Sequence, residues 1–358
     1  MTGRGIDQIL PNPSDLQLFE PYVTSALTYV ELAEHVAGPI PRGVAFEYVW
    51  GDALKELERV HPDARIINLE TAVTTSPRAW PNKAIHYRLH PANLPCLSAA
   101  KVDCCVLANN HVMDWGRPGL EETLVALHAA GIHTAGAGRD AAAAAAPAAI
   151  DCSGGQRVLV FAYGMQSSGV LPAWRATREE PGINWLSDLS AHSIDSVGQH
   201  ISQYAQQPGV IVASIHWGNN WGYEISHDER EFAHRLIDTA GVDVVHGHSS
   251  HHAKGIEVYG GKLILYGCGD LLNDYEGIGG HEEHRGDLGV MYFPTLDAGN
   301  GNLLRLSMTP TRTQRFRLHQ APAEATAWMC GTLDRECRKL GTRIRQQSDG
   351  TLSLQWDA

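Results

Sequence analysis

Short apolar segments alternate with amphipathic helical patterns along most of this chain, and this alternation limits the possible folds more than any other feature. The segments lie at 64–70, 102–111, 157–164, 209–218 and 242–248, and their length and composition predict buried strands. The patterns at 116–131 and 228–241 have helical spacing and end at a glycine, as helices commonly do. Strands that alternate with helices predict an α/β fold.

Different patterns follow in the last third of the chain. Residues 252–270 predict a hairpin that turns at Gly260-Gly261, and two further strand patterns lie at 287–294 and 303–310. A last helical pattern lies near 322–340, and the alanine-rich stretch 141–149 predicts a short helix that Pro147 ends. We therefore expect one domain with a layered β-sandwich core flanked by helices.

Composition excludes several classes of protein. The chain has 358 residues, 43% of them hydrophobic, and a net charge of −12, which disfavours binding to nucleic acid. Seven cysteines without a C-x-x-C pair do not predict a disulfide framework and favour a reducing compartment. We find no apolar run long enough to span a membrane and no signal-peptide pattern, so we expect a cytoplasmic location for the chain as given.

Polar residues gather where the predicted strands end. Each of four apolar segments is followed by side chains that can bind a metal ion: Asn68 and Glu70; Asn109, Asn110, His111 and Asp114; His216; and His246, His248 and His251. Any one of them could simply be a polar strand end. Because ligands of open α/β sheets bind beyond the carboxyl ends of strands, four such ends together favour a metal site.

The types of ligand narrow the choice of metal. Histidine, carboxylate and amide oxygen without cysteine suit Mn, Fe or catalytic Zn better than structural zinc. The set suffices for one divalent ion, or for two if water or a bridging carboxylate takes part.

Five spaced motifs resemble the CapA family, named for poly-gamma-glutamate capsule biosynthesis, within the calcineurin-like metallophosphoesterase superfamily. They are NLETAVT (68–74), LANNHVMDWGRPGLEETL (107–124), GAG (136–138), SIHWG (214–218) and DVVHGHSSHHAKGIEVYGGKLILYGCGD (243–270). The resemblance covers about residues 1–275. It implies a metallophosphoesterase-like αββα domain over 1–300, with 301–358 as a C-terminal strand and helix extension packed on the same domain.

The resemblance also implies roles for individual residues. The metal ligands would be Glu70, Asn110, His216, His248 and His251. His111 would be the catalytic histidine that gives a proton to the leaving group, Asp114 would orient it, and Arg4 joins this catalytic set. Asn68, Trp221 and Tyr223 are candidates for substrate binding; surface packing explains the two aromatic residues equally well.

The chain departs from the family pattern at two places. The family motif G-H-H-P-H reads Gly247-His248-Ser249-Ser250-His251 here, which keeps the spacing of two histidines and leaves His246 and His252 outside the pattern. Asp270 stands where the family more often has asparagine, which adds a negative charge near the predicted site.

The resemblance implies a metal-dependent hydrolase that uses activated water on a phosphoester or gamma-glutamyl amide bond. The substrate would be an anionic small molecule or polymer, and the oligomeric state is open. The alternative is a non-catalytic accessory subunit for synthesis or export of an anionic polymer such as poly-gamma-glutamate.

The first residues, MTGRG, resemble the family segment that follows a first β-strand ending in Gly-Asp, whose aspartate is a metal ligand. We therefore expect that this strand and its aspartate precede Met1 in the natural protein. The chain as given is then expected to be less stable and short of one carboxylate at its site.

Overall fold

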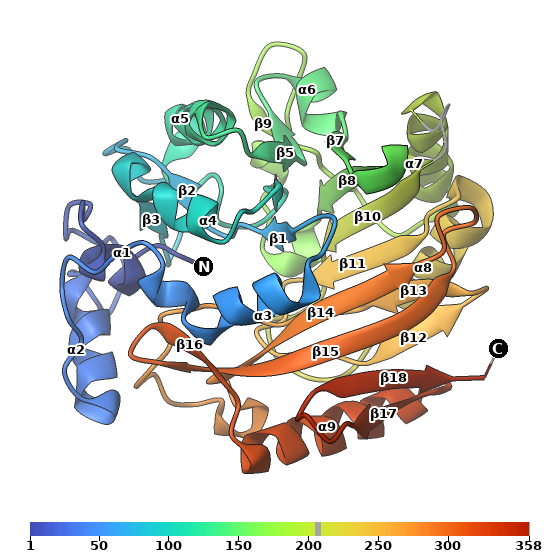
Figure 1. Cartoon of the computed structure of the whole chain (residues 1–358). Helices are drawn as coiled ribbons and strands as arrows, with labels where there is room; N and C mark the ends of the chain where they lie inside the picture. The colour runs from blue at the N-terminus through green and yellow to red at the C-terminus, as the bar shows by residue number, and fades with distance from the viewer. Residues whose placement is uncertain (205–208, 358) are drawn as a thin grey trace.

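The computed structural model describes residues 1–204 and 209–357, and a six-stranded sheet lies at its centre (Figure 1). The strand order is β12-β13-β11-β10-β8-β7. β8, β10, β11 and β13 are parallel, and β7 and β12 pair antiparallel at the two edges. The strands are β7 (Ala148–Asp151), β8 (Arg157–Gly164), β10 (Val210–His216), β11 (Val244–His248), β12 (Ile256–Tyr259) and β13 (Lys262–Leu265).

The two faces of this sheet bury different side chains, because successive residues of a strand point to opposite faces. Phe161 and Ile215 pack against the helices α7 (Ala191–Tyr204) and α8 (His227–Ala240). Helix α8 begins with a capping box between Ser226 and Glu229, and it ends at Gly241, whose φ of 69° is a conformation that glycine adopts without strain.

The opposite face packs against a second, antiparallel sheet, drawn in orange to red in Figure 1. Its order is β14-β15-β18-β17, with β16 paired to β15. Val160 and Val212 of the first sheet share a buried cluster with Val290, Leu306 and side chains of α9. The elements are β14 (Leu288–Leu296), β15 (Leu303–Gln314), β16 (Arg317–Gln320), α9 (Ala323–Arg338), β17 (Thr342–Gln346) and β18 (Leu352–Trp356).

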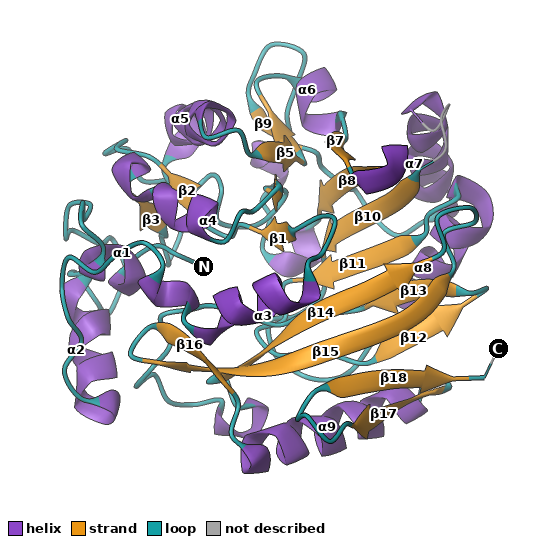
Figure 2. Cartoon of the chain, viewed as in Figure 1, coloured by secondary structure: helices purple, strands orange, loops and turns teal. Residues whose placement is uncertain are grey.

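A third, parallel sheet, in the order β1-β4-β5, comes from the first half of the chain (Figure 2). Its strands are β1 (Ile66–Asn68), β4 (Cys104–Val106) and β5 (His133–Ala135). Two small pairs join β2 (Ala72–Val73) to β3 (Arg88–Leu89) and β6 (Ala137–Gly138) to β9 (Gly182–Ile183).

The remaining helices lie mainly around the amino-terminal half. They are α1 (Gly5–Ile9), α2 (Leu27–Ala37), α3 (Asp52–Val60), α4 (Pro95–Ala99), α5 (Gly116–Ala129) and α6 (Ala141–Ala145), with short 3₁₀ turns at Tyr48–Trp50, Pro91–Asn93, Ser153–Gly155, Gln166–Ser168, Pro172–Trp174 and Glu282–His284. Within the described ranges, no helix is long and apolar enough to cross a membrane.

The mixed α/β class is confirmed, and so are the predicted central strands, the hairpin at Gly260-Gly261 and the helices at 116–131, 228–241 and 322–340. The helix predicted at 141–149 ends at Ala145, and β7 begins at Ala148. β1 and β4 are shorter than predicted, because the chain leaves each strand for a polar turn. The pattern missed the helices before β1 and the strands β17 and β18. The predicted boundary at residue 300 falls between β14 and β15, which pair closely. The metallophosphoesterase-like αββα order stays a prediction.

Candidate functional site

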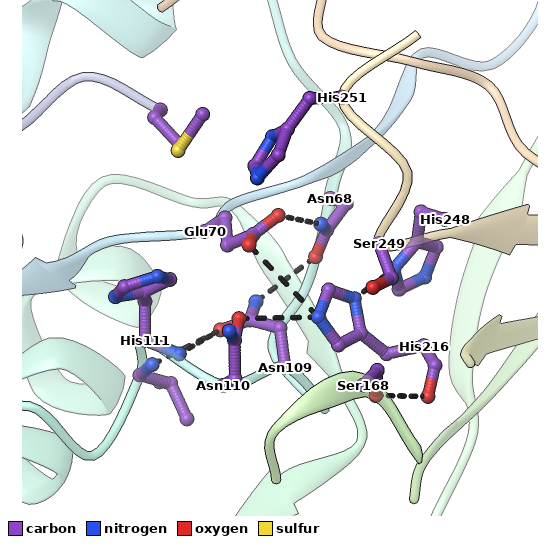
Figure 3. Close-up of polar contacts among 12 residues, drawn as sticks. Asn68, Glu70, Asn109, Asn110, His111, Ser168, His216, His248, Ser249 and His251 are labelled. Atoms are coloured by element: carbon purple, nitrogen blue, oxygen red, sulfur yellow. Dashed lines mark hydrogen bonds and ion pairs between the residues drawn. The ribbon is translucent and has the colours of Figure 1, made fainter. Parts of the chain in front are cut away.

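The predicted ligands Glu70, Asn110 and His216 approach one another beyond the ends of β1, β4 and β10 (Figure 3). His216 Nε2 lies 3.1 Å from Asn110 Oδ1 and 3.9 Å from Glu70 Oε1. His216 is completely buried, and burial lowers the pKa of its imidazole well below the ordinary value. The neutral imidazole is the form that binds a metal ion.

Glu70 is a buried carboxylate with few partners. Its side chain accepts a hydrogen bond of 2.9 Å from Asn68 Nδ2, and the residue is 6% exposed. Burial raises the pKa of Glu70 to about 7, against the opposing effect of nearby His251. A buried carboxyl with a raised pKa marks a place where a bound cation would stabilise the ionised form.

This pKa makes the stability of the metal-free protein depend on pH. Because the folded state prefers the protonated carboxyl of Glu70, the free energy of unfolding should fall as pH rises from about 4.5 to about 7. Glu70→Gln should remove this slope and make the metal-free protein more stable at pH 8 by up to about 3 kcal/mol, because the buried carboxylate no longer has to ionise. Denaturant titrations at several pH values measure it.

The matched control is Glu231→Gln, which changes an exposed glutamate of α8. It should leave the pH profile of stability unchanged. If the free energy of unfolding changed with pH in the same way in the wild type and in Glu70→Gln, the raised pKa of Glu70 would be contradicted.

His111 lies beside the first group and is held by a buried carboxylate. Its Nδ1 is 2.8 Å from Asp114 Oδ2, and Asp114 also accepts a hydrogen bond of 2.6 Å from the amide of Tyr87. The ring of Tyr87 meets the ring of His111 edge-on, with 4.6 Å between centroids. These contacts fix the orientation of the His111 ring.

Lys83 completes this arrangement, and sequence patterns gave no sign of it. Its Nζ lies 2.8 Å from Asp114 Oδ1 and 3.2 Å from His111 Nδ1. Burial lowers the pKa of His111 to about 4. Burial alone would raise the pKa of Asp114, but the neighbouring His111 and Lys83 outweigh this effect and hold the pKa of Asp114 below its ordinary value. The pair is therefore a neutral imidazole beside an ionised carboxylate near neutral pH.

His248 lies next to His216 because β10 and β11 pair in register at these two residues. The Nδ1 atoms of the two rings are 2.7 Å apart, and His248 Nε2 is 2.9 Å from Ser214 Oγ. Ser214 also contacts His246 Nδ1 at 2.8 Å. The alternation of side chains along β10 could have indicated Ser214, which lies on the same face as His216.

His251 reaches the group from the segment after β11 (Figure 3). Its Nδ1 is 3.1 Å from Asp270 Oδ2, and this carboxylate outweighs burial to raise the pKa of His251. Asp270, the departure from the family pattern, also accepts a hydrogen bond from Asn273 Nδ2 at 3.0 Å.

The predicted substrate residues Trp221 and Tyr223 lie beside this end of the site. Trp221 lies 5.2 Å from His251 between ring centroids and stacks on His281 at 4.0 Å. Tyr223 contacts His252, which is 3% exposed and therefore not a surface residue. Asn68 lies at the centre, where it joins Glu70 to Asn109.

Arg4 lies apart from the predicted ligands, in a buried ion-pair network. Its guanidinium donates to both carboxylate oxygens of Asp274, at 3.1 and 2.7 Å, and to Glu20 at 3.2 Å. The guanidinium also stacks on Tyr29 and Tyr87, with 3.7 and 4.3 Å to the ring centroids. Arg4 therefore approaches His111 only through Tyr87.

The side chains fit a divalent cation by the chemistry of their donors. A carboxylate, an amide oxygen and a neutral imidazole meet around His216 Nε2. Among the residues that the structure describes, no lysine or arginine side chain hydrogen-bonds to the buried Glu70. Across residues 1–204 and 209–357, no three His, Cys, Asp or Glu side chains form a metal-holding group by themselves.

Comparison with known proteins shows which family and which relatives the sequence of this chain matches. Residues 1–275 match the family described as bacterial capsule synthesis protein PGA_cap. A "probable polyglutamine synthesis accessory protein" of Mycobacterium tuberculosis is 44% identical over 99% of this chain and 93% of its own length. The "PGA biosynthesis protein CapA" of Bacillus subtilis is 25% identical over 77% of this chain and 67% of its own length. The "capsule biosynthesis protein CapA" of Bacillus anthracis is 28% identical over 54% of this chain and 45% of its own length.

Proposed function

Because this chain belongs to the PGA_cap family of bacterial capsule synthesis proteins, we propose that it is an accessory protein in the synthesis of an anionic glutamate polymer. The observation that carries the proposal is the 44% identity, over nearly all of both chains, to a relative named as a probable polyglutamine synthesis accessory protein. A second relative is named for PGA biosynthesis. The proposed ligand is a segment of the polymer, which binds at the group formed by Glu70, Asn110, His111 and His216.

Electrostatics decide how such binding can occur. The chain carries a net charge of −12, so its average field repels a polyanion. Binding therefore needs local positive charge, which Lys83 and a bound divalent cation supply at the site. We expect affinity for the polymer to depend on the cation.

Fluorescence anisotropy of labelled poly-gamma-glutamate tests the accessory role. The protein should bind the polymer in the presence of Mn²⁺ and lose this binding with a chelator. Hyaluronate, a polyanion without peptide bonds, is the control and should bind weakly. Equal affinity for both polymers, or no binding with or without Mn²⁺, would contradict the proposal.

A second candidate function is metal-dependent hydrolysis at the same site. The contacts of His111 favour it, because a pure binding surface has no need of a buried imidazole held by Asp114 and Lys83. Glu70, Asn110, His216 and His251 would hold the cation, and His248, whose ring nitrogens contact Ser214 and His216, would hold the ring of His216. When bound, a divalent cation supplies activation of water and stabilisation of negative charge in the transition state.

The chain's own residues then have separate tasks. His111 is neutral near pH 7 and donates its Nδ1 proton to Asp114, so Nε2 can take a proton from an attacking nucleophile and then give this proton to a leaving group. Asp114 holds the ring in place and stabilises the imidazolium when the proton moves to His111. The bond that is cleaved, phosphoester or gamma-glutamyl amide, is set by the polymer or small molecule that binds.

Metal content separates the ligands from their neighbours. His216→Ala should lose most of the bound metal, because His216 faces Glu70 and Asn110. His248→Ala should also lose most of it, because His248 holds the ring of His216 in place. His252→Ala should keep the metal, since that ring stacks on His284 away from Glu70. Elemental analysis of purified protein measures it, and full occupancy in His216→Ala would refute the ligand set.

A further inference from the structure

Positive charge gathers near the carboxyl end of this acidic chain, where α9 and β17 lie side by side (Figure 1). Residues 334–346 contain five cations and two carboxylates, a net charge of +3, whereas the whole chain carries −12. All five cations are exposed, and we call them the basic strip: Arg335, Arg338, Lys339, Arg343 and Arg345. The strip lies outside residues 1–275, which match the PGA_cap family.

Two carboxylates beneath the surface hold four of these cations. The side chain of Glu336 is 4% exposed and that of Asp334 is 17% exposed, whereas the four paired cations are 56–64% exposed. The pairs are Arg335 and Lys339 at 2.8 and 2.5 Å from Glu336, and Arg338 and Arg343 at 2.6 and 3.2 Å from Asp334. The negative charges therefore lie below, and they hold the positive charges toward solvent.

The strip continues from the helix onto the neighbouring strand. Cations in the last turn of a helix stabilise its negative end, and this effect accounts for Arg335 and Arg338. It does not account for Arg343 and Arg345, which lie on the exposed face of β17 on either side of the buried Ile344. The positive charge is therefore a property of this surface and not only of a helix end.

One end of the strip lies beside the candidate site. The guanidinium of Arg335 lies 5.3 Å from the ring centroid of Tyr223, one of the predicted substrate residues. A side chain at Gly255 would meet Leu340 at 2.8 Å, so the end of α9 packs against the segment that follows His251. A polymer that leaves the site past Tyr223 therefore reaches Arg335 first.

We propose that the basic strip binds the part of an anionic glutamate polymer that extends from the site past Tyr223, so that one polymer chain contacts the site and the strip together. This inference deepens the proposed function and rests on it. The ligand is a row of carboxylates, and guanidinium groups bind carboxylates through paired N–H donors. A second contact on the same chain raises the affinity for a long polymer and leaves that for a short one unchanged.

A variant with three charges removed tests the strip. It carries Arg338→Gln, Lys339→Gln and Arg345→Gln, so that Glu336 keeps Arg335 and Asp334 keeps Arg343. With Mn²⁺ present, it should bind long poly-gamma-glutamate at least about tenfold more weakly than the wild type, because charged contacts at the edge of an interface are lost. Its affinity for tri-gamma-glutamate, its bound metal and its melting temperature should stay unchanged.

The matched control carries Lys55→Gln, Arg139→Gln and Arg178→Gln, one lysine and two arginines that are exposed elsewhere on the molecule. It should bind the long polymer like the wild type. Carbodiimide coupling of the polymer to the wild type needs no substitution, because it joins polymer carboxylates to nearby lysine amines. Peptide mass spectrometry should find the polymer on Lys339 at least tenfold more often than on Lys55.

The outcomes separate this inference from the proposed function. If the wild type binds the polymer with Mn²⁺ but the strip variant binds it equally well and Lys339 does not couple, the strip is overturned and the proposed function stands. If the wild type does not bind the polymer, the proposed function fails and the strip fails with it. An equal loss of affinity for tri-gamma-glutamate would move the effect to the site and overturn the strip. Tighter binding of double-stranded DNA than of the polymer, lost in the strip variant, would overturn it in favour of nucleic acid.

Discussion

His111→Ala is expected to lower hydrolytic turnover by about 10²–10⁴-fold while the bound metal stays in place, the usual size of a general acid–base contribution. The reason is geometric. His111 contacts Asp114 and Lys83 through Nδ1, which leaves Nε2 for proton transfer, and no hydrogen bond in the described part of the chain joins its side chain to Glu70 or His216. Hydrolysis of an aryl phosphate and of poly-gamma-glutamate, each with added Mn²⁺, measures the loss.

His252→Ala is the matched control, because it removes a buried histidine that contacts Tyr223 and His284. It should retain turnover. Loss of metal from His111→Ala would make His111 a ligand and not a proton donor. If the wild type hydrolyses neither substrate, hydrolysis is refuted and only the accessory role remains.

Arg4→Met is expected to lower the free energy of unfolding by about 3–5 kcal/mol, the usual cost of removing one partner from a buried ion pair. The substitution keeps an apolar stem but leaves Asp274 and Glu20 buried without their cation. The side chains of all three residues are at most 2% exposed, so water cannot replace the guanidinium. Denaturant unfolding of the metal-free protein measures the change.

Lys55→Met is the control for this prediction. It removes the cation of an exposed ion pair with Asp52 on α3, where the lysine side chain is 82% exposed. Exposed pairs contribute little to stability, so the unfolding curve should hardly move. A loss for Arg4→Met no larger than for Lys55→Met would refute the role assigned to the network.

The strand-end positions of the site residues could be predicted, and their partners could not. Asn110, His216 and His248 each follow or end an apolar segment, so the expectation that they meet at one edge needed only the parallel arrangement of strands. Lys83 lies in an irregular loop without periodicity, and its contact with Asp114 joins residues 31 positions apart, from 83 to 114. No local pattern encodes such a contact.

The partners of Arg4 could not be predicted from the sequence either. The motif Gly3-Arg4-Gly5 indicated an important arginine and suggested a place among the catalytic residues. Its main partner, Asp274, is 270 residues away in the sequence, and only the folded chain brings the two together. The structure shows Arg4 in contact with Tyr87 and two carboxylates, which supports a positioning role for it.

The mixed α/β class, the central strands and the set of polar strand ends could be predicted, because alternation, helical spacing and glycine stops are local properties of the chain. Which polar groups meet depends on the folded chain. The register of β10 and β11 put His216 against His248, and burial changed the pKa of Glu70 and His111. Register and burial depend on how separate sheets pack, which no local segment specifies.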